Sequence, residues 1–500
     1  MLQPNDTVVD GGRVSTGSVA LDDILAGGLD PDRIYLYEGK PGTGKTTLAL
    51  QFLLHGASAG ENTLYVSLSE SRRELDLIAA RHGWSMNKVT VFELVPTESL
   101  IDPRNEVTVL HPAEFELNET LKSVFDKVAE IKPSRVVFDS LSEVRLLAQD
   151  PLRYRRQILA LKHFFANQSC TVVLLDDLSG AANDLQLHSI AHGVVNLEQL
   201  AIDFGGERRR LRVVKMRGIA FRGGFHDFTI RKGGLEIYPR LVASEHHRPF
   251  EKGFVPSGNA ELDLLLGGGL ERGTNVLLLG AAGVGKSSLA ISYALAAAER
   301  GEHSAFFAFD EGRGTFEARA QTLGLNLQPA LESGLIRFQQ VDPAELSPGE
   351  FAAIIRHSVE QDGARVVVID SLTGYLNSMP DERFLVLQMH ELLNYLGQLG
   401  VLTIMVLAQH GLVGPMESPV DLSYLADSVL LLRYFEAKGT VRRALSVVKK
   451  RSGGHEHTIR EYTLSNRGIR LGPPLKDFTG IFSGTPRYEG PALPAIGRDD

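Results

Sequence analysis

A short glycine-rich segment that occurs twice constrains this chain of 500 residues more than any other feature of its sequence. It reads GKPGTGKTT at residues 39–47 and GAAGVGKSS at residues 280–288. Both copies satisfy the pattern G-x-x-x-x-G-K-[ST], in which glycines let the backbone wrap around an anion so that several N–H groups point inward. The sequence therefore predicts two phosphate-binding loops, each joining a strand to the start of a helix.

The residues of each loop are expected to share the work of holding a nucleoside phosphate. Lys45 and Lys286 add a positive charge at the phosphates, while the hydroxyl groups of Thr46 and Ser287 can ligate Mg²⁺. The residues expected to contact the nucleotide are Gly39, Gly42, Thr43, Gly44, Lys45, Thr46 and Thr47 in the first copy, and Gly280, Gly283, Val284, Gly285, Lys286, Ser287 and Ser288 in the second.

The repetition extends well beyond the loops. When Gly280 is placed on Gly39, Thr16-Gly17 meets Ser257-Gly258, and Gly27-Gly28-Leu29 meets Gly268-Gly269-Leu270. After a small drift that loop differences explain, RVVFDSL (135–141) matches RVVVIDSL (365–372), and VVKMRG (213–218) matches VVKKRSG (447–453). The chain is therefore a duplicated domain. We expect domains at residues 1–243 and 250–480, with the boundary near the polar segment Ser244–Gly253, and a flexible Pro/Gly-rich tail at 481–500.

Within each copy, short apolar runs alternate with longer helical ones. This alternation predicts an α/β fold, with a mostly parallel sheet covered by helices on both faces. In the first copy the expected strands are residues 33–39, 63–70, 135–140 and 170–178, and the expected helices are residues 46–58, 71–83 and 154–168. Late in each copy, RRLRVVKMRG and RRALSVVKKRSGG predict hairpin strands instead of crossover units.

Acidic residues follow the strands that should lie beside the loops. Asp139 and Asp370 each end an apolar run, at the strand edge where a carboxylate can hold Mg²⁺ through water. Hydrolysis or phosphoryl transfer also needs a carboxylate that orients or deprotonates the nucleophile. Glu70 in the first copy, and Asp310 and Glu311 in the second, are the candidates for that role.

Composition limits the class of protein. The content of 43% hydrophobic and 23% charged residues is that of a soluble globular protein, and we find neither a secretory signal nor an apolar run of about 20 residues. A single cysteine, Cys170, suits a reducing compartment, so we expect a cytoplasmic protein without membrane contact. The net charge of −9 makes nucleic acid an unlikely partner, although Gly205–Gly218 carries six Arg and Lys residues that could touch it.

Both loops, both strand-ending aspartates, the acidic residues and the paired K-x-R hairpins together resemble the KaiC family, double-domain ATPases of RecA-like fold. The resemblance implies tandem RecA-like domains that bind ATP and Mg²⁺ between the subunits of a homohexameric double ring. It also implies that a neighbouring subunit supplies cations to the γ-phosphate, as an arginine finger does. These cations would be Lys215 and Arg217 for the first ring, and Lys449 and Arg451 for the second.

The chain departs from the clock members of the family at two places. They carry two adjacent glutamates where this chain has Ser69-Glu70 and Asp310-Glu311, so we expect the first ring mainly to bind ATP and the second to hydrolyse it or phosphorylate the chain. They also phosphorylate an adjacent Ser and Thr where this chain has Ser423-Tyr424. Ser423 remains the candidate phosphoacceptor, whereas a tyrosine hydroxyl lies too far from its backbone for the same geometry.

Two other classes of function stay open from the sequence. One is a DNA-handling motor of RadA or DnaB type, which would be stimulated by single-stranded DNA. The other is a nucleotide-gated scaffold whose regulatory partner binds the C-terminal tail. At the end of a strand of the second copy, Gln409 is a further candidate for sensing the γ-phosphate, and an ordinary turn is the alternative reading.

Overall fold

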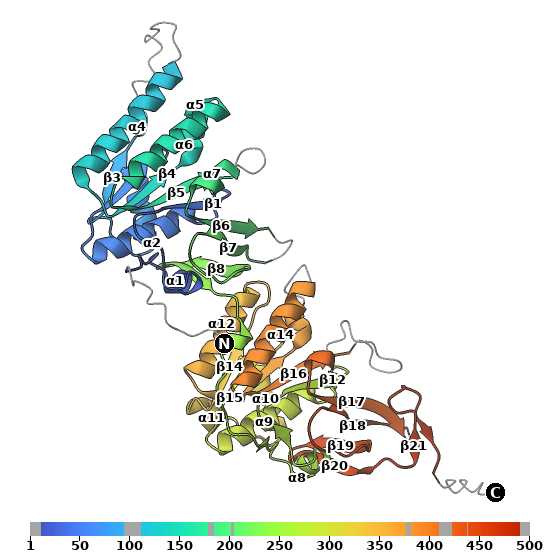
Figure 1. Cartoon of the computed structure of the whole chain (residues 1–500). Coiled ribbons are helices and arrows are strands. Elements are labelled where there is room, and N and C mark those ends of the chain that lie inside the picture. The colour runs from blue at the N-terminus through green and yellow to red at the C-terminus, as the bar shows by residue number, and fades with distance from the viewer. Residues whose placement is uncertain are drawn as a thin grey trace, which may run out of the picture. The chain divides into compact units, whose positions relative to one another are not determined.

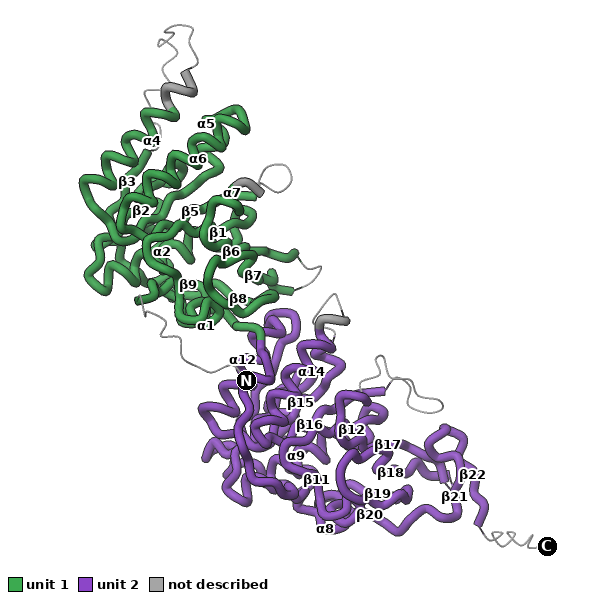
Figure 2. The backbone as a smooth tube through the Cα atoms, in the orientation of Figure 1, with its two compact units in different colours: residues 1–240 green, residues 241–500 purple. Residues whose placement is uncertain are grey.

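The apolar runs of the sequence form the central strands of two sheets in the computed structural model (Figure 1). The structure describes residues 12–94, 112–178, 185–201, 205–376, 382–409, 423–437 and 439–490. The chain divides into two units, Met1–Arg240 and Leu241–Asp500 (Figure 2). Each unit contains one nine-stranded sheet.

The elements of the first unit alternate as the sequence predicts. The helices are α1 (Val19–Ile24), α2 (Lys45–Ser58), α3 (Arg72–Arg81), α4 (Pro112–Ile131), α5 (Leu141–Ala148), α6 (Pro151–Ala166) and α7 (Leu185–Ile190). The strands are β1 (Ile34–Gly39), β2 (Thr63–Ser67), β3 (Thr90–Glu93), β4 (Arg135–Asp139), β5 (Thr171–Asp177), β6 (Gly193–Leu200), β7 (Arg208–Met216), β8 (His226–Arg231) and β9 (Gly234–Tyr238).

The second unit begins with a 3₁₀ turn, η2 (Ala243–Glu245), and repeats the same plan. Its helices are α8 (Ala260–Leu265), α9 (Lys286–Glu299), α10 (Arg313–Thr322), α11 (Gln328–Glu332), α12 (Pro348–Glu360), α13 (Leu372–Leu376), α14 (Glu382–Gln398) and the 3₁₀ turn η3 (Ser423–Leu425). Its strands are β10 (Phe254–Val255), β11 (Leu270–Glu271), β12 (Asn275–Gly280), β13 (His303–Ala308), β14 (Ile336–Gln340), β15 (Ala364–Asp370), β16 (Leu402–Ala408), β17 (Ser428–Ala437), β18 (Thr440–Lys450), β19 (Arg460–Ser465), β20 (Gly468–Pro474), β21 (Phe478–Thr479) and β22 (Arg487–Tyr488).

Both large sheets have the same strand order. It is β3-β2-β4-β5-β1-β6-β7-β8-β9 in the first unit and β14-β13-β15-β16-β12-β17-β18-β19-β20 in the second. The first six strands of each sheet are parallel, and the remaining three are antiparallel. The predicted α/β fold is confirmed, as are the late hairpin strands, which are β7 and β18.

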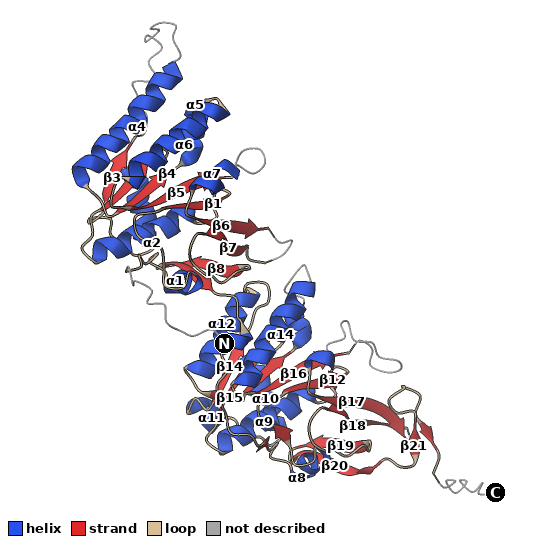
Figure 3. Ribbon diagram, viewed as in Figure 1, coloured by secondary structure: helices blue, strands red, loops and turns tan. Residues whose placement is uncertain are grey.

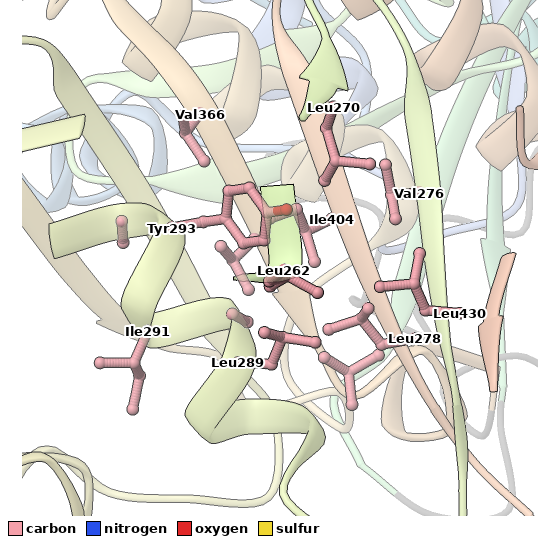
Figure 4. Packing of buried hydrophobic residues seen from close by; sticks show 14 of the residues in the cluster. Leu262, Leu270, Val276, Leu278, Leu289, Ile291, Tyr293, Val366, Ile404 and Leu430 are labelled. Carbon is pink, nitrogen blue, oxygen red and sulfur yellow. The ribbon is translucent and has the colours of Figure 1, made fainter. Parts of the chain in front are cut away.

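Helices cover both faces of the parallel part of each sheet (Figure 3). In the first unit, α1, α2 and α3 pack on one face and α4, α5 and α6 on the other, and each face has its own core of buried side chains. In the second unit, Leu289 and Tyr293 of α9 pack against Leu278 and Ile404 of the sheet in the same way (Figure 4). Because both faces are covered, the central strands have no polar face, which explains their continuous apolar runs.

The ends of the second unit differ from the predicted boundaries. Ala243, expected at the end of the first domain, is buried in a core of the second unit. Ile481, expected to begin a flexible tail, is buried beside Phe435, and the guanidinium of Arg433 donates to the carbonyl oxygen of Phe482. The start of the predicted tail is therefore part of the folded unit, and residues 491–500 lie outside the described residues. No helix in the described ranges is long and apolar enough to cross a membrane.

Candidate nucleotide sites

The two phosphate loops end in helices that have no side-chain cap. Gly44 and Gly285 precede α2 and α9 with φ of +99° and +112°, and neither helix start receives a side-chain hydrogen bond. At α6, by contrast, Asp150 accepts hydrogen bonds from the first-turn N–H groups. The φ of Gly44 is one that side chains of L residues rarely adopt, and a Cβ atom there would also lie 2.8 Å from the tip of the Ile230 side chain, so both features favour glycine. The uncapped helix starts leave N–H donors for an anion.

The loop lysines are buried and bound to their own loops. Lys45 Nζ donates to the carbonyl oxygens of Gly39 (2.8 Å) and Lys40 (3.0 Å). Lys286 Nζ donates in the same way to Gly280 (2.8 Å) and Ala281 (2.7 Å). Burial lowers the pKa of Lys286 to about 8, against the opposing effect of Asp370. Each ammonium group is thus held at the mouth of its loop.

The predicted metal-binding residues come together in both units. Asp139 accepts hydrogen bonds from Thr46 and from the hydroxyl group of Tyr65, and Asp370 accepts one from Ser287. Burial raises the pKa of both carboxyl groups. Each aspartate is followed by a cis peptide bond. A hydroxyl group beside a carboxylate at the start of the loop helix is a donor set that suits Mg²⁺.

Glu70 and Glu311 occupy equivalent positions after β2 and β13, but their surroundings differ. Each has one buried carboxylate oxygen without a hydrogen-bond partner among the described residues. Burial, with the charges of Asp139, Glu74 and Asp177, raises the pKa of Glu70 to about 7. The second carboxylate oxygen of Glu311 is ion-paired with Arg319 at 2.5 Å. Burial raises the pKa of Glu311, although the positive charge of Arg319 lowers it.

Asp310, the extra acidic residue of the second copy, makes a structural contact. The hydroxyl group of Ser371 donates to its carboxylate at 2.6 Å and accepts from the N–H of Gly374 at 3.2 Å. Asp310 therefore ties the end of β13 to the segment that follows Asp370. Catalytic roles for Asp310 and Glu311 both stay predictions, and Glu311 is the one with a buried carboxylate oxygen that has no hydrogen-bond partner among the described residues.

Asp177, at the end of β5, was not among the site residues predicted from the sequence. Its carboxylate forms an ion pair with Lys45 Nζ at 2.6 Å. Asp177 pairs with Gly39 in the parallel register, and the residue that pairs with Gly280 in the second unit is Ala408. The signal was present as the acidic end of CTVVLLDDL, but the contact depends on β5 lying beside β1.

The candidate cations of the first unit hold the segment before β6. Lys215 Nζ donates to the carbonyl oxygens of His188 and Ala191, and Arg217 donates to that of Ser189 at 2.7 Å. Basic residues further up the same hairpin strand are paired with acids, since Arg210 contacts Glu198 at 2.8 Å.

The second unit repeats this arrangement around the candidate phosphoacceptor. Lys449 Nζ donates to the carbonyl oxygens of Ser423 and Ala426, both at 2.8 Å, and Arg451 donates to that of Tyr424 at 2.9 Å. Ser423 therefore occupies the position of His188 in the first unit. The structure brings the candidate cations and the candidate phosphoacceptor into one cluster.

Gln409 follows β16 at the edge of the second loop. Its backbone N–H donates to the carbonyl oxygen of Gly280 at 3.0 Å, and its side-chain oxygen is buried without a hydrogen-bond partner in the described part of the chain. Sensing of the γ-phosphate by Gln409 stays a prediction.

The groups gathered at each loop fit Mg-ATP. The uncapped N–H donors and the loop lysine suit phosphate oxygens. The hydroxyl–carboxylate pairs suit a hard cation such as Mg²⁺. The carboxylate oxygens of Glu70 and Glu311 that have no partner among the described residues could accept a hydrogen bond from water. The sheet order and these sites define a tandem P-loop ATPase of RecA-like fold.

Comparison with known proteins identifies the family. The family model described as "ATPase: KaiC" matches residues 14–242 and 255–476, and the chain belongs to that family. It is similar to the circadian clock oscillator proteins KaiC of Picosynechococcus sp. (27% identical over 483 residues) and of Thermostichus vulcanus (27% over 484 residues), each alignment covering 95% of this chain and 92% of the relative. It is also similar to the circadian clock protein KaiC3 of Synechocystis sp., 26% identical over 484 residues, which are 95% of each chain.

Proposed function

We propose that both units bind Mg-ATP, that Glu70 and Glu311 serve its hydrolysis, and that the chain acts as a homohexameric switch. The observation that carries the proposal is the repeated site. In each unit a loop lysine, a hydroxyl–aspartate pair and a glutamate oxygen without a partner gather at one uncapped helix.

Each group has a distinct task in this proposal. The loop lysine would offset charge on the β- and γ-phosphates. Thr46 with Asp139, or Ser287 with Asp370, would hold Mg²⁺, which would supply charge stabilisation at the phosphates. Glu70 or Glu311 accepts a hydrogen bond from the attacking water and orients it. Because Glu70 is only about half ionised near neutral pH, the first site should turn over more slowly than the second.

Assembly would complete each site. Lys215 and Arg217, like Lys449 and Arg451, would reach the γ-phosphate bound to a neighbouring subunit. Their contacts with backbone carbonyls would couple that phosphate to the segment before β6 or β17. We expect sedimentation to show a hexamer with Mg-ATP, and Lys449→Ala to lower turnover without preventing nucleotide binding. A turnover rate unchanged by Lys449→Ala would count against supply of this cation by a neighbour.

Ser423 is the proposed phosphoacceptor. Its neighbour Tyr424 is 52% exposed, but the tyrosine hydroxyl extends too far from the backbone to replace a threonine. Intact mass and phosphopeptide mapping after incubation with Mg-ATP, with free phosphate assayed in the same tube, would separate the two reactions. Phosphate on Ser423 that is absent from the Ser423→Ala protein would establish autophosphorylation. Free phosphate with an unmodified chain would leave an ATPase alone.

The structure favours this function over a DNA motor. Arg209 and Arg210 of the basic hairpin strand are ion-paired with Glu207 and Glu198, and the guanidinium of Arg210 also lies 3.8 Å from the ring centre of Phe225. These cations are therefore engaged within the unit and are poorly placed to release counterions from a nucleic acid. We expect single-stranded DNA to leave the ATPase rate unchanged. A regulatory protein that binds the C-terminal tail remains a proposal for the partner.

A further inference from the structure

The lysines of the two phosphate loops differ in their charged partners. In the first unit Lys45 is 7% exposed and its ammonium group is ion-paired with Asp177, which is 30% exposed. In the second unit Ala408 takes the place of that aspartate in the sheet. Lys286 donates to carbonyl oxygens of its own loop, and among the described residues no carboxylate forms an ion pair with it.

The charges around the two loops diverge further through the catalytic carboxylates. Asp177 disfavours ionisation of both Glu70 and Asp139, so these carboxylates form one electrostatic cluster in the first site. In the second site, Arg319 is ion-paired with Glu311 and also favours the ionised form of Asp370. The loop lysine of the first site thus has an aspartate as its partner, whereas in the second site an arginine is paired with the glutamate. The additional acid of the second site, Asp310, is hydrogen-bonded to Ser371.

The different partners of Lys45 and Lys286 affect how phosphate oxygens can bind to each lysine. Phosphate oxygens that approach Lys45 must displace the carboxylate of Asp177 and then lie near it, whereas those that approach Lys286 displace only neutral carbonyl oxygens. A bound divalent cation would compensate the negative charge of Asp177 beside Lys45 in the first site. The requirement for that cation should therefore be stronger in the first site than in the second.

We propose that Asp177 makes the first site a strictly Mg²⁺-dependent nucleotide site, whereas the second site retains nucleotide when Mg²⁺ is withdrawn. The inference rests on the proposed function, since it assumes that both loops bind ATP. In the assembled protein, the first ring would then release its nucleotide when Mg²⁺ is withdrawn, whereas the second ring would keep its nucleotide bound.

The test measures equilibrium binding of a fluorescent, non-hydrolysable ATP analogue to the full chain, with Mg²⁺ or with EDTA. Lys286→Ala leaves the first site to be measured, and Lys45→Ala leaves the second. We expect EDTA to weaken binding at the first site about tenfold to a hundredfold more than at the second, the size of a charge-assisted contact. Adding Asp177→Ala should remove most of that difference, and adding Ala408→Asp to the Lys45→Ala protein should create it at the second site.

Two outcomes would overturn the inference. One is an equal loss of binding on EDTA addition at both sites, and the other is an Mg²⁺ requirement unchanged by Asp177→Ala. Asp177→Asn, which keeps the size of the side chain, should behave as Asp177→Ala, and its binding in Mg²⁺ verifies that the loop is folded. Absence of analogue binding at either site even with Mg²⁺ would instead contradict the proposed function itself.

Discussion

The raised pKa of Glu70 leads to a pH dependence that can be worked out in advance. The ionised carboxylate is the form that can accept a proton or a hydrogen bond from water, so hydrolysis at the first site should increase as pH rises through the pKa of about 7. A group with that pKa is roughly a tenth ionised at about pH 6 and roughly nine tenths ionised at about pH 8. We therefore expect kcat/KM of the first site to rise roughly tenfold over this interval.

The measurement uses the Glu311→Gln protein, in which the second site is slowed, and assays phosphate release against Mg-ATP concentration at each pH. The quantity to follow is kcat/KM, because it reports the pKa of the free protein. Adding Glu70→Gln should lower kcat/KM by about 10²- to 10⁴-fold and remove the rise with pH. Adding Asp177→Asn should move the rise to lower pH, because the charge of Asp177 helps to raise the pKa of Glu70.

A matched control lies on the next helix. Asp76 is paired with Arg72 on the exposed side of α3, so Asp76→Asn should leave both the rate and its pH profile unchanged. A flat profile in the Glu311→Gln protein would refute the assignment of Glu70 as the ionising group. If the protein with both Glu70→Gln and Glu311→Gln hydrolyses ATP as fast as the Glu311→Gln protein, a role of Glu70 in catalysis is refuted.

Further expectations concern both function and stability. At neutral pH, Glu311→Gln should lower phosphate release more than Glu70→Gln, and the reverse ranking would contradict the division of labour between the units. Gly44→Ala should weaken Mg-ATP binding at the first loop while circular dichroism stays unchanged, because the φ of +99° at the start of the loop helix is strained for any residue with a Cβ atom. Glu61→Ala should destabilise the first unit by about 3 kcal/mol in urea unfolding, because it leaves the buried guanidinium of Arg135, 3% exposed, without its carboxylate.

Two substitutions serve as controls for these expectations. Gly60 also has a positive φ, +85°, but a Cβ atom there would meet nothing within 4 Å, so Gly60→Ala should bind Mg-ATP normally. Glu130 is paired with Lys127 on an exposed helix face, so Glu130→Ala should change stability by less than about 1 kcal/mol. If Glu130→Ala lowered the free energy of unfolding as much as Glu61→Ala, burial of the ion pair would not explain the loss of stability.

The sequence by itself determined the duplicated architecture and the main ligand-binding groups. Glycine spacing, an apolar run before each loop and an aspartate at a strand end are local patterns, and the physical constraints behind them act within a few residues. Thr46 with Asp139, and Ser287 with Asp370, could therefore be expected together from the strand–loop–helix pattern. Both pairs are hydrogen-bonded in the structure.

Only the tertiary structure decided which charges meet. Because β5 lies between β4 and β1, Asp177 reaches Lys45, a contact that no local pattern specifies. Asp310 and Glu311 look interchangeable in the sequence, yet one is bound by Ser371 and the other is paired with an arginine two helical turns further on. The contacts of Asp177 and Asp310 join residues far apart in the chain and depend on strand order, and the contact of Glu311 depends on the rotation of the helix that follows it. Through these contacts two similar loops acquire different electrostatic surroundings.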